Sequence, residues 1–264
     1  MPLTEVPSAT HRTLTGSLKQ LIVRGILAGF VAGILAGGVA YITGEQHIDA
    51  AIAIEESHAD TANDHDANAA ESHHHEDSEP LVSRDGQRAG LFLATALSGA
   101  ALGAIYACVL AAARTRTTLA AAALIATVGA AGWFSVASVP FLKYPANPPA
   151  VGNPDTIDQR TILWFAMVLL GVFAVAAFVI VRRAVGARTS SVILPSAAAA
   201  VALLIIVAAG YTWAPVIDEV TSDFPASLLW QFRMSAAATQ LTLWIAMVAM
   251  FAYLTERSSQ RLSL

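Results

Sequence analysis

The sequence predicts an all-α integral membrane protein, a polytopic bundle of six transmembrane helices with an acidic, histidine-rich outer loop. The first observation is composition: 56% of the residues are hydrophobic and 13% are charged, whereas soluble proteins carry about 25% charged residues. The second is that the apolar residues come in long blocks, and about 18 or more such residues can cross a membrane as a helix. The third is an uneven distribution of charge between the loops.

Six apolar blocks mark the predicted spans of a single membrane domain over residues 1–264. A helix satisfies its backbone hydrogen bonds within one segment, as a lipid environment requires. Only residues 114–117 separate the second block from the third, which predicts a tight antiparallel hairpin. The blocks cover 21–43, 89–113, 118–142, 161–181, 192–213 and 234–254.

The basic residues indicate the orientation. If the sides alternate along the chain, one side holds ten of the fifteen basic residues but only two acidic residues, Glu5 and Glu256. Loops rich in lysine and arginine face the cytoplasm. We therefore expect a multi-pass protein of the cell membrane, inner or plasma, with both termini cytoplasmic. The basic residues of that side are Arg12, Lys19, Arg24, Arg114, Arg116, Arg182, Arg183, Arg188, Arg257 and Arg261.

The first block carries glycines at every fourth position of one helical face, at Gly25, Gly29, Gly33 and Gly37. Small residues at this spacing let two membrane helices approach closely. We interpret them as a helix-packing face within the bundle, with packing against a separate subunit as the alternative. The polar residues of the spans, such as Gln240, are interpreted as contacts between helices.

The outer loop at residues 44–87 has the most distinctive chemistry. Between Glu45 and Ser83 it contains eleven carboxylates, six of the chain's seven histidines and no lysine or arginine. Imidazole suits zinc, nickel, copper and cobalt, and carboxylates add oxygen ligands. We predict a loop that binds divalent metal ions; the alternative is an acidic loop that is only solvated. The candidate ligands are Glu45, His47, Asp49, Glu55, His58, His65, His73, His74 and His75.

The loop is expected to have two parts. Residues 45–56 look helical, as an extension of the first span. Residues 57–79 have almost no large apolar side chain, so they cannot bury enough surface to become ordered and should be flexible until metal binds. Such a tract favours capture or buffering of metal over a rigid catalytic site.

Several motifs are missing. The sequence has no GxxxxGK[ST] phosphate loop and no HExxH helix, which are the signatures of nucleotide hydrolysis and zinc proteolysis. We therefore expect no bound nucleotide, no catalytic residues and no enzyme activity, with membrane lipid around the chain and no nucleic-acid partner. A divalent cation that enters an inside-negative cell gains about 4.6 kcal/mol per 100 mV, so inward transport is physically reasonable.

Several stretches resemble the CbtA family of predicted bacterial cobalt transporter subunits. The most specific is the proline-rich PFLKYPANPPAVG at 140–152. The others are RGILAG at 24–29, GEQHIDAAIAIE at 44–55, DTIDQRT at 155–161 and FPASLLWQFR at 224–233. The family is commonly described with five spans, whereas this sequence predicts six.

The resemblance implies cobalt uptake linked to cobalamin synthesis, with Co²⁺ as the substrate. It also implies a small single-span, histidine-bearing partner of the CbtB type, and the glycine face of the first helix is a candidate docking face for it. The divalent series does not single out cobalt. The alternatives are therefore a nickel or zinc transport or efflux component, and a non-transporting metal chaperone or assembly subunit.

We expect the 45–56 segment and the two matched outer loops to form an outer vestibule. Arg160 and Arg233 are positioned to pair with the outer acids. The alternative is that these residues are caps and ion pairs that fix the loops. The vestibule candidates are Lys143, Asn147, Asp155, Arg160, Asp218 and Arg233.

Overall fold

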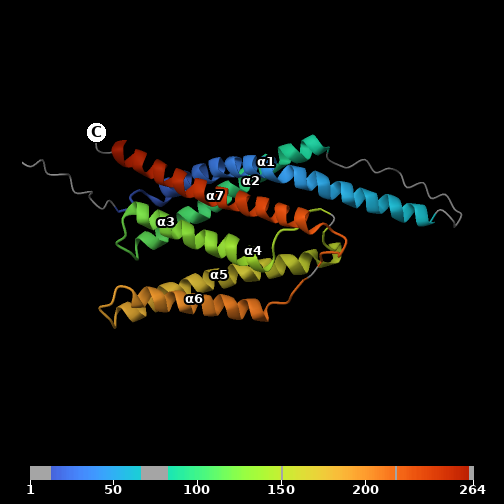
Figure 1. Cartoon of the computed structure of the whole chain (residues 1–264). Coiled ribbons are helices and arrows are strands. Elements are labelled where there is room, and N and C mark those ends of the chain that lie inside the picture. Colours follow the sequence, from blue (N-terminus) through green and yellow to red (C-terminus); the bar gives the residue numbers. More distant parts are fainter. Residues whose placement is uncertain (1–12, 67–82, 150, 218, 262–264) are drawn as a thin grey trace, which may run out of the picture. The chain divides into compact units, whose positions relative to one another are not determined.

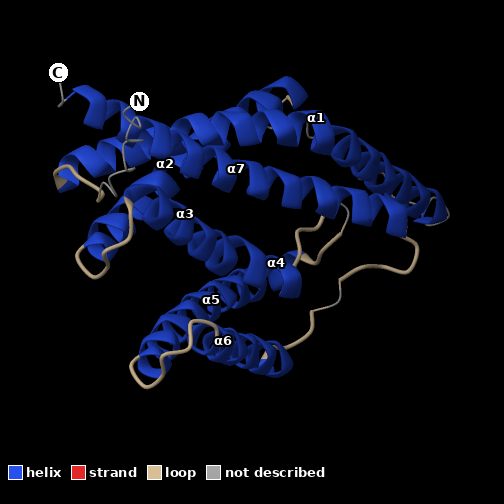
Figure 2. Cartoon of the chain, turned by 60° about the vertical axis from the view of Figure 1, so that its left-hand side comes forward, coloured by secondary structure: helices blue, strands red, loops and turns tan. Residues whose placement is uncertain are grey.

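The computed structural model describes residues 13–66, 83–149, 151–217 and 219–261, and these ranges consist of helices and loops (Figures 1 and 2). The predicted all-α class is therefore confirmed. One short segment, η1, is a π-helix, and another, η2, is a 3₁₀ helix. The elements are α1 (Leu18–Asp66), α2 (Arg84–Arg114), α3 (Ala121–Gly132), η1 (Trp133–Ser138), α4 (Val139–Lys143), η2 (Pro154–Thr156), α5 (Ile157–Gly186), α6 (Leu194–Trp213) and α7 (Ala226–Arg261).

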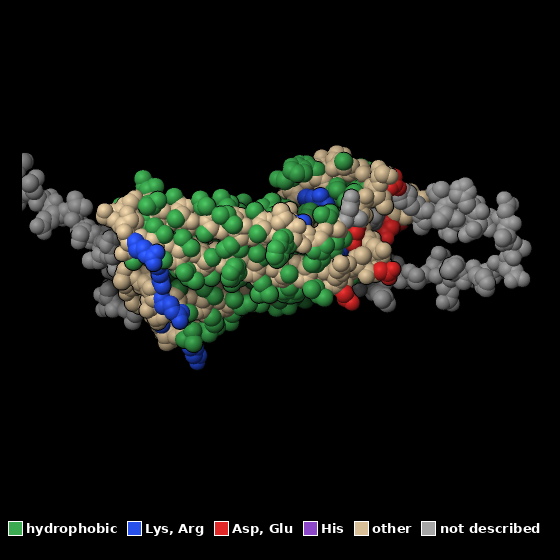
Figure 3. All heavy atoms as spheres, turned by 90° about the horizontal axis from the view of Figure 1, so that it is seen from below, with side chains coloured by type: hydrophobic (Ala, Val, Ile, Leu, Met, Phe, Trp, Pro, Cys, Tyr) green, Lys and Arg blue, Asp and Glu red, His purple; other side chains and the backbone are tan. Residues whose placement is uncertain are grey.

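Within the described residues, six helical segments are long and apolar enough to cross a membrane, as predicted. One of them, Ala121–Lys143, combines α3, η1 and α4. Large apolar side chains of α5 and α6 point outward: Leu169 is 68% exposed and Leu204 is 64% exposed. Hydrophobic side chains also cover much of the face drawn in Figure 3. An apolar patch of this extent is what lipid tails require and what a water-exposed monomer avoids.

Helix α1 extends further than the sequence suggested. The segment 45–56 is helical, and the helix continues to Asp66, into the tract 57–79 that we expected to be flexible until metal binds. The physical reason is that extending an existing helix adds one hydrogen bond per residue, while the unfavourable nucleation step occurs only once. The remainder of that tract, 67–79, lies outside the described residues.

The chain divides into two compact units. Unit 1 comprises Met1–Ala36, Phe92–Ala130 and Thr242–Leu264. Unit 2 comprises Gly37–Leu91 and Ala131–Leu241. The organisation as a single membrane domain stays a prediction.

In unit 1 the glycine face of α1 packs against α2. A Cβ atom on Gly25 would lie 2.2 Å from the carbonyl oxygen of Gly103, and one on Gly33 would lie 2.2 Å from that of Thr95. The two backbones therefore touch, and no side chain fits between them. Gly37, the last glycine of this series, is buried and belongs to unit 2. Because α2 occupies this face at Gly25 and Gly33, those glycines are not open to a partner subunit.

Tyr106 of α2 contacts two other helices of unit 1, α3 and α7. Its hydroxyl donates a 2.6 Å hydrogen bond to the carbonyl oxygen of Ile125 in α3. Its ring meets that of Phe251 in α7 edge to face, with centroids 5.4 Å apart. This geometry suits the quadrupoles of two aromatic rings. One aromatic residue thus connects three helices.

In unit 2 the π-helix η1 interrupts a span just before Pro140. The N–H of Val139 donates to the carbonyl oxygen of Phe134, five residues earlier. Pro140 has no N–H, so it cannot continue that pattern. On α5, Gly171 allows the backbone of η1 to approach closely: a Cβ there would lie 2.7 Å from Cα of Ser135.

Helices α1 and α7 are connected in unit 2 by a 2.7 Å hydrogen bond. Oγ of Ser235 in α7 donates it to the carbonyl oxygen of Thr43 in α1.

Candidate functional site

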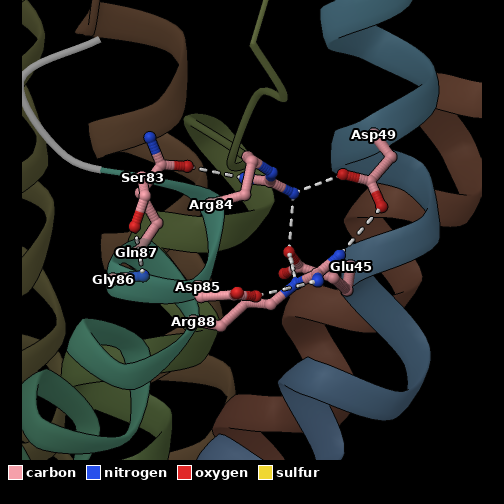
Figure 4. Close-up of polar contacts among 8 residues, drawn as sticks. All are labelled: Glu45, Asp49, Ser83, Arg84, Asp85, Gly86, Gln87 and Arg88. Carbon is pink, nitrogen blue, oxygen red and sulfur yellow. Dashed lines mark hydrogen bonds and ion pairs between the residues drawn. The ribbon is translucent and has the colours of Figure 1, made fainter.

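Two acids of α1 and two arginines of α2 form a charge cluster in unit 2 (Figure 4). Oε1 of Glu45 lies 2.6 Å from Nη2 of Arg84 and 3.0 Å from Nε of Arg88. Asp49 pairs with both arginines as well, at 3.5 Å from Arg88. Each pair is spaced four residues apart along its helix, so the two acids and the two arginines face each other in register. The cluster fastens α1 to α2.

This cluster changes the environment of two predicted metal ligands. Glu45, whose side chain is 12% exposed, and Asp49, at 48%, each have guanidinium partners. Arg84 and Arg88 were not among the residues predicted from the sequence. Their spacing of four residues, which matches that of the two acids, was the available signal.

The other predicted ligands are spread out or lie beyond the described part of the chain. His47 is half-buried and Glu55 is exposed. Among the side chains that the structure describes, no three His, Cys, Asp or Glu residues come together as a metal site. The side chains of His58 and His65 lie outside the described residues, as do His73, His74 and His75. The metal-binding role of all these residues stays a prediction.

Arg160 pairs with an acid of the loop between α6 and α7, one of the pairings that the sequence suggested. Its Nη1 lies 2.7 Å from Oε2 of Glu219, whose side chain is only 6% exposed. The hydroxyl of Thr156 donates to the other carboxylate oxygen of Glu219. Gly152, at φ +134°, passes next to this pair: a Cβ there would lie 3.2 Å from Nη1 of Arg160. The pair therefore joins the start of α5 to the segment before α7.

Arg233 fixes the proline-rich loop. It donates hydrogen bonds to Oδ1 of Asn147, at 2.9 Å, and to the carbonyl oxygen of Ala146. Lys143 donates to the carbonyl oxygen of Tyr211 at 3.0 Å. Asp155 is exposed in η2, and Asp218 lies outside the described residues.

An apolar cluster brings three of the matched stretches together in unit 2. Ala51 of α1, Val151 of the proline-rich loop, and Phe224 and Leu229 near the start of α7 pack against one another. All four are buried, with Ala51 fully inaccessible. Stretches that are far apart in the sequence thus share one core next to the polar contacts described above.

Beside this cluster, unit 2 contains a cavity of about 650 Å³. Its wall is mostly apolar, and its polar residues include Tyr144, Arg160 and Gln240. Burial raises the pKa of the Tyr144 phenol above its ordinary value. Its hydroxyl donates a hydrogen bond to the carbonyl oxygen of Pro215. The matched stretches 44–55, 140–152, 155–161 and 224–233 all contribute residues to the wall.

A family comparison agrees with the resemblance on which these stretches were chosen. The model of the CbtA family, described as a probable cobalt transporter subunit, matches residues 18–256. Comparisons with curated proteins and with solved structures gave no match. The match covers all six candidate spans almost completely, including every segment that lines the cavity. The chain therefore belongs to the CbtA family of probable cobalt transporter subunits.

Proposed function

We propose that this chain is the membrane subunit of a Co²⁺ uptake system, with both termini in the cytoplasm. The observation that carries the proposal is the family match over residues 18–256. The cavity in unit 2 supports it, because the stretches that resemble the family converge there. An inside-negative membrane potential drives a divalent cation inward without nucleotide hydrolysis, by about 4.6 kcal/mol per 100 mV.

The histidine-rich part of the outer loop captures the metal. Glu45 and Asp49 are balanced by Arg84 and Arg88, so capture depends mainly on the histidines and on the remaining acids of the loop, such as the exposed Glu55. Neutral imidazole is a good ligand for Co²⁺ and is the dominant form near pH 7. An anionic outer surface also raises the local cation concentration.

A second subunit completes the system. The family description calls its members subunits, and the resemblance to CbtA implies a small, single-span, histidine-bearing partner of the CbtB type. The face of α1 that carries Gly25 and Gly29 is filled by α2. We therefore expect this partner to use another surface, and we expect Co²⁺ uptake to require both chains.

The direct test is uptake of radiolabelled Co²⁺ by cells without their own cobalt importers. The chain is expressed alone and with the small partner, and Ni²⁺ and Zn²⁺ are added as competitors. We expect uptake that resists both competitors and that requires the partner. Absence of uptake in every combination, with the protein present in the membrane, would favour the chaperone and efflux alternatives.

The role of the loop is tested with two variants. One lacks residues 57–79, and the other keeps the length of the loop but carries glutamine at His58, His65, His73, His74 and His75. We expect both to need a higher Co²⁺ concentration for half-maximal uptake, with little change in the maximal rate. A fall in the maximal rate alone would contradict capture by the tract.

The vestibule formed by the 45–56 segment and the outer loops is tested by neutralising Glu45, Asp49 and Asp155. Asp155→Asn is the cleanest of the three variants, since Asp155 is exposed and its carboxylate lies outside the charge cluster. We expect lower uptake at low Co²⁺ concentration. Unchanged uptake in all three variants would remove the vestibule from the proposal.

A further inference from the structure

One wall of the cavity in unit 2 is formed by a membrane-spanning helix. Ser235, Ala236, Thr239 and Gln240 of α7 line it, and they belong to the candidate span Ala226–Ser258. Polar side chains at membrane depth are tolerated where they face protein partners or water-filled space. About 650 Å³ next to these side chains is therefore open to water or to a ligand.

The hydroxyl groups in the cavity wall donate their protons in hydrogen bonds to backbone carbonyl oxygens. Oγ1 of Thr161 donates to the carbonyl oxygen of Ile157 at 2.9 Å, and Oγ1 of Thr239 donates to that of Ser235 at 2.9 Å. The hydroxyls of Ser235 and Tyr144 also donate to backbone carbonyls. A hydroxyl has one proton but two lone pairs. Each of these oxygens can therefore only accept a further hydrogen bond or coordinate a cation.

Gln240 adds an uncommitted amide. Its side chain is exposed and makes no hydrogen bond with the part of the chain that the structure describes. Leaving an amide without a partner in hydrocarbon costs several kcal/mol. Because Gln240 lines the cavity, water or a hydrated ligand in the cavity removes this penalty.

The charged side chain in the wall is Arg160. Its guanidinium is compensated by Glu219, 2.7 Å away and nearly fully buried, so the pair presents a dipole and no net charge. Trp164 also lines the cavity, and its indole carries one N–H donor and no acceptor. The remaining side-chain oxygens act as acceptors, and this balance favours a cation over an anion.

We infer that this cavity is a hydrated intramembrane site for a divalent cation, in which Gln240 and Thr239 contact the ion through its water. The inference rests on the proposed transport function, and it makes the cavity a binding site on the path of the transported ion. Neutral oxygens bind such an ion weakly. Weak binding suits conduction, because a transported ion must enter and also leave.

The test uses thiol labelling, which needs no transport. Cys108 is the single cysteine of the chain and is exposed on α2, outside the cavity, so it is first replaced by serine. Ala236→Cys then places a thiol in the cavity one turn before Gln240. Ala238→Cys is the matched control, since Ala238 is exposed on the same helix but does not line the cavity. The probe is a charged, membrane-impermeant methanethiosulfonate applied from outside, with and without Co²⁺.

We expect Ala236→Cys to react and Ala238→Cys to remain unlabelled. With Co²⁺ at about ten times its dissociation constant, mass action predicts labelling about tenfold slower. In the double variant Ala236→Cys/Gln240→Leu, labelling should persist but protection by Co²⁺ should be lost. Gln240→Asn in place of Gln240→Leu should restore part of the protection.

Three results would overturn the inference. Equal labelling of both cysteines, or of neither, would mean that the cavity is not a distinct hydrated space. Protection that survives Gln240→Leu would remove Gln240 from the site. Protection by vesicles of an anionic phospholipid, with no effect of Co²⁺, would make the cavity a headgroup site organised by Arg160. Co²⁺ protection combined with absent uptake would count against the transport function and leave the cation site intact.

Discussion

Gly29 and Gly99 touch through their backbones: a Cβ atom on Gly29 would lie 1.9 Å from the carbonyl oxygen of Gly99. The contact is reciprocal, since a Cβ on Gly99 would lie 2.3 Å from the carbonyl oxygen of Gly29. Backbone atoms cannot give way as the end of a flexible side chain can. Any side chain at either position must therefore separate α1 from α2.

Gly29→Ala should destabilise the protein by about 1–3 kcal/mol, the usual range for overpacking a tight contact. The matched control is Gly38→Ala on the same helix, because a Cβ on Gly38 meets no atom within 4 Å. Thermal unfolding in detergent measures both variants. An equal effect of the two would show that α1 and α2 do not pack through this face.

Glu45→Gln should weaken the attachment of α1 to α2. The substitution removes a charge that accepts hydrogen bonds from Arg84 and Arg88, and a hydrogen bond to a charged group contributes about 1.5–3 kcal/mol. Glu55→Gln, at an exposed position of the same helix, should change stability by less than about 0.5 kcal/mol. Unfolding is measured first without metal and then with Co²⁺. If the destabilisation appeared only with Co²⁺ present, Glu45 would be a metal ligand first and a structural residue second.

Glu219→Gln should destabilise the protein strongly. It leaves the Arg160 guanidinium without its buried partner, and breaking a buried pair on one side costs roughly 3–5 kcal/mol. Arg160 is 30% exposed, so the effect should fall at the lower end of that range. Asp155→Asn, an exposed acid near the start of α5, should cost less than about 1 kcal/mol. Comparable losses in the two variants would mean that burial of Glu219 is unimportant.

Two glycine substitutions should change stability in opposite directions. Gly152→Ala places a Cβ at φ +134° and 3.2 Å from Nη1 of Arg160, and backbone strain of this kind costs about 1–3 kcal/mol. Gly90→Ala lies in α2 with open space around the new methyl group. It should stabilise the protein by about 0.4–1 kcal/mol, because alanine lowers the conformational entropy of the unfolded chain. Unfolding midpoints distinguish the signs directly, and a neutral Gly152→Ala would contradict the close packing at Arg160.

The fold could be predicted because the hydrocarbon core of a membrane offers no water to the backbone, so each apolar block must satisfy its own hydrogen bonds. Apolar blocks must be helical, and their number follows from the sequence. The pairing of Arg160 with an outer acid could also be anticipated, since both groups belong to loops on the same side. The ends of the helices were less predictable: α7 begins at Ala226, eight residues before its apolar block, because helices continue into the polar interface.

The spacing of Arg84 and Arg88 was a signal for the charge cluster, but which residues meet there, and where the cavity forms, could not be predicted. Glu45 meets Arg88 across two helices, and such contacts depend on how each helix is rotated about its axis. Gln240 was interpreted as a contact between helices, yet it lines the cavity. A hydropathy profile reports depth in the membrane and carries no information about rotation, so it cannot separate these two roles.

The π-turn of η1 has a consequence for comparing this chain with its relatives. A π-turn holds one more residue than the α-turn that it replaces, and each residue of a helix turns the chain by about 100°. The direction in which Phe141 and Tyr144 face the cavity therefore depends on a single extra residue between Trp133 and Ser138. A relative that lacks one residue there would present different side chains to the same space, so a one-residue alignment gap at this point would mark a change in the cavity wall.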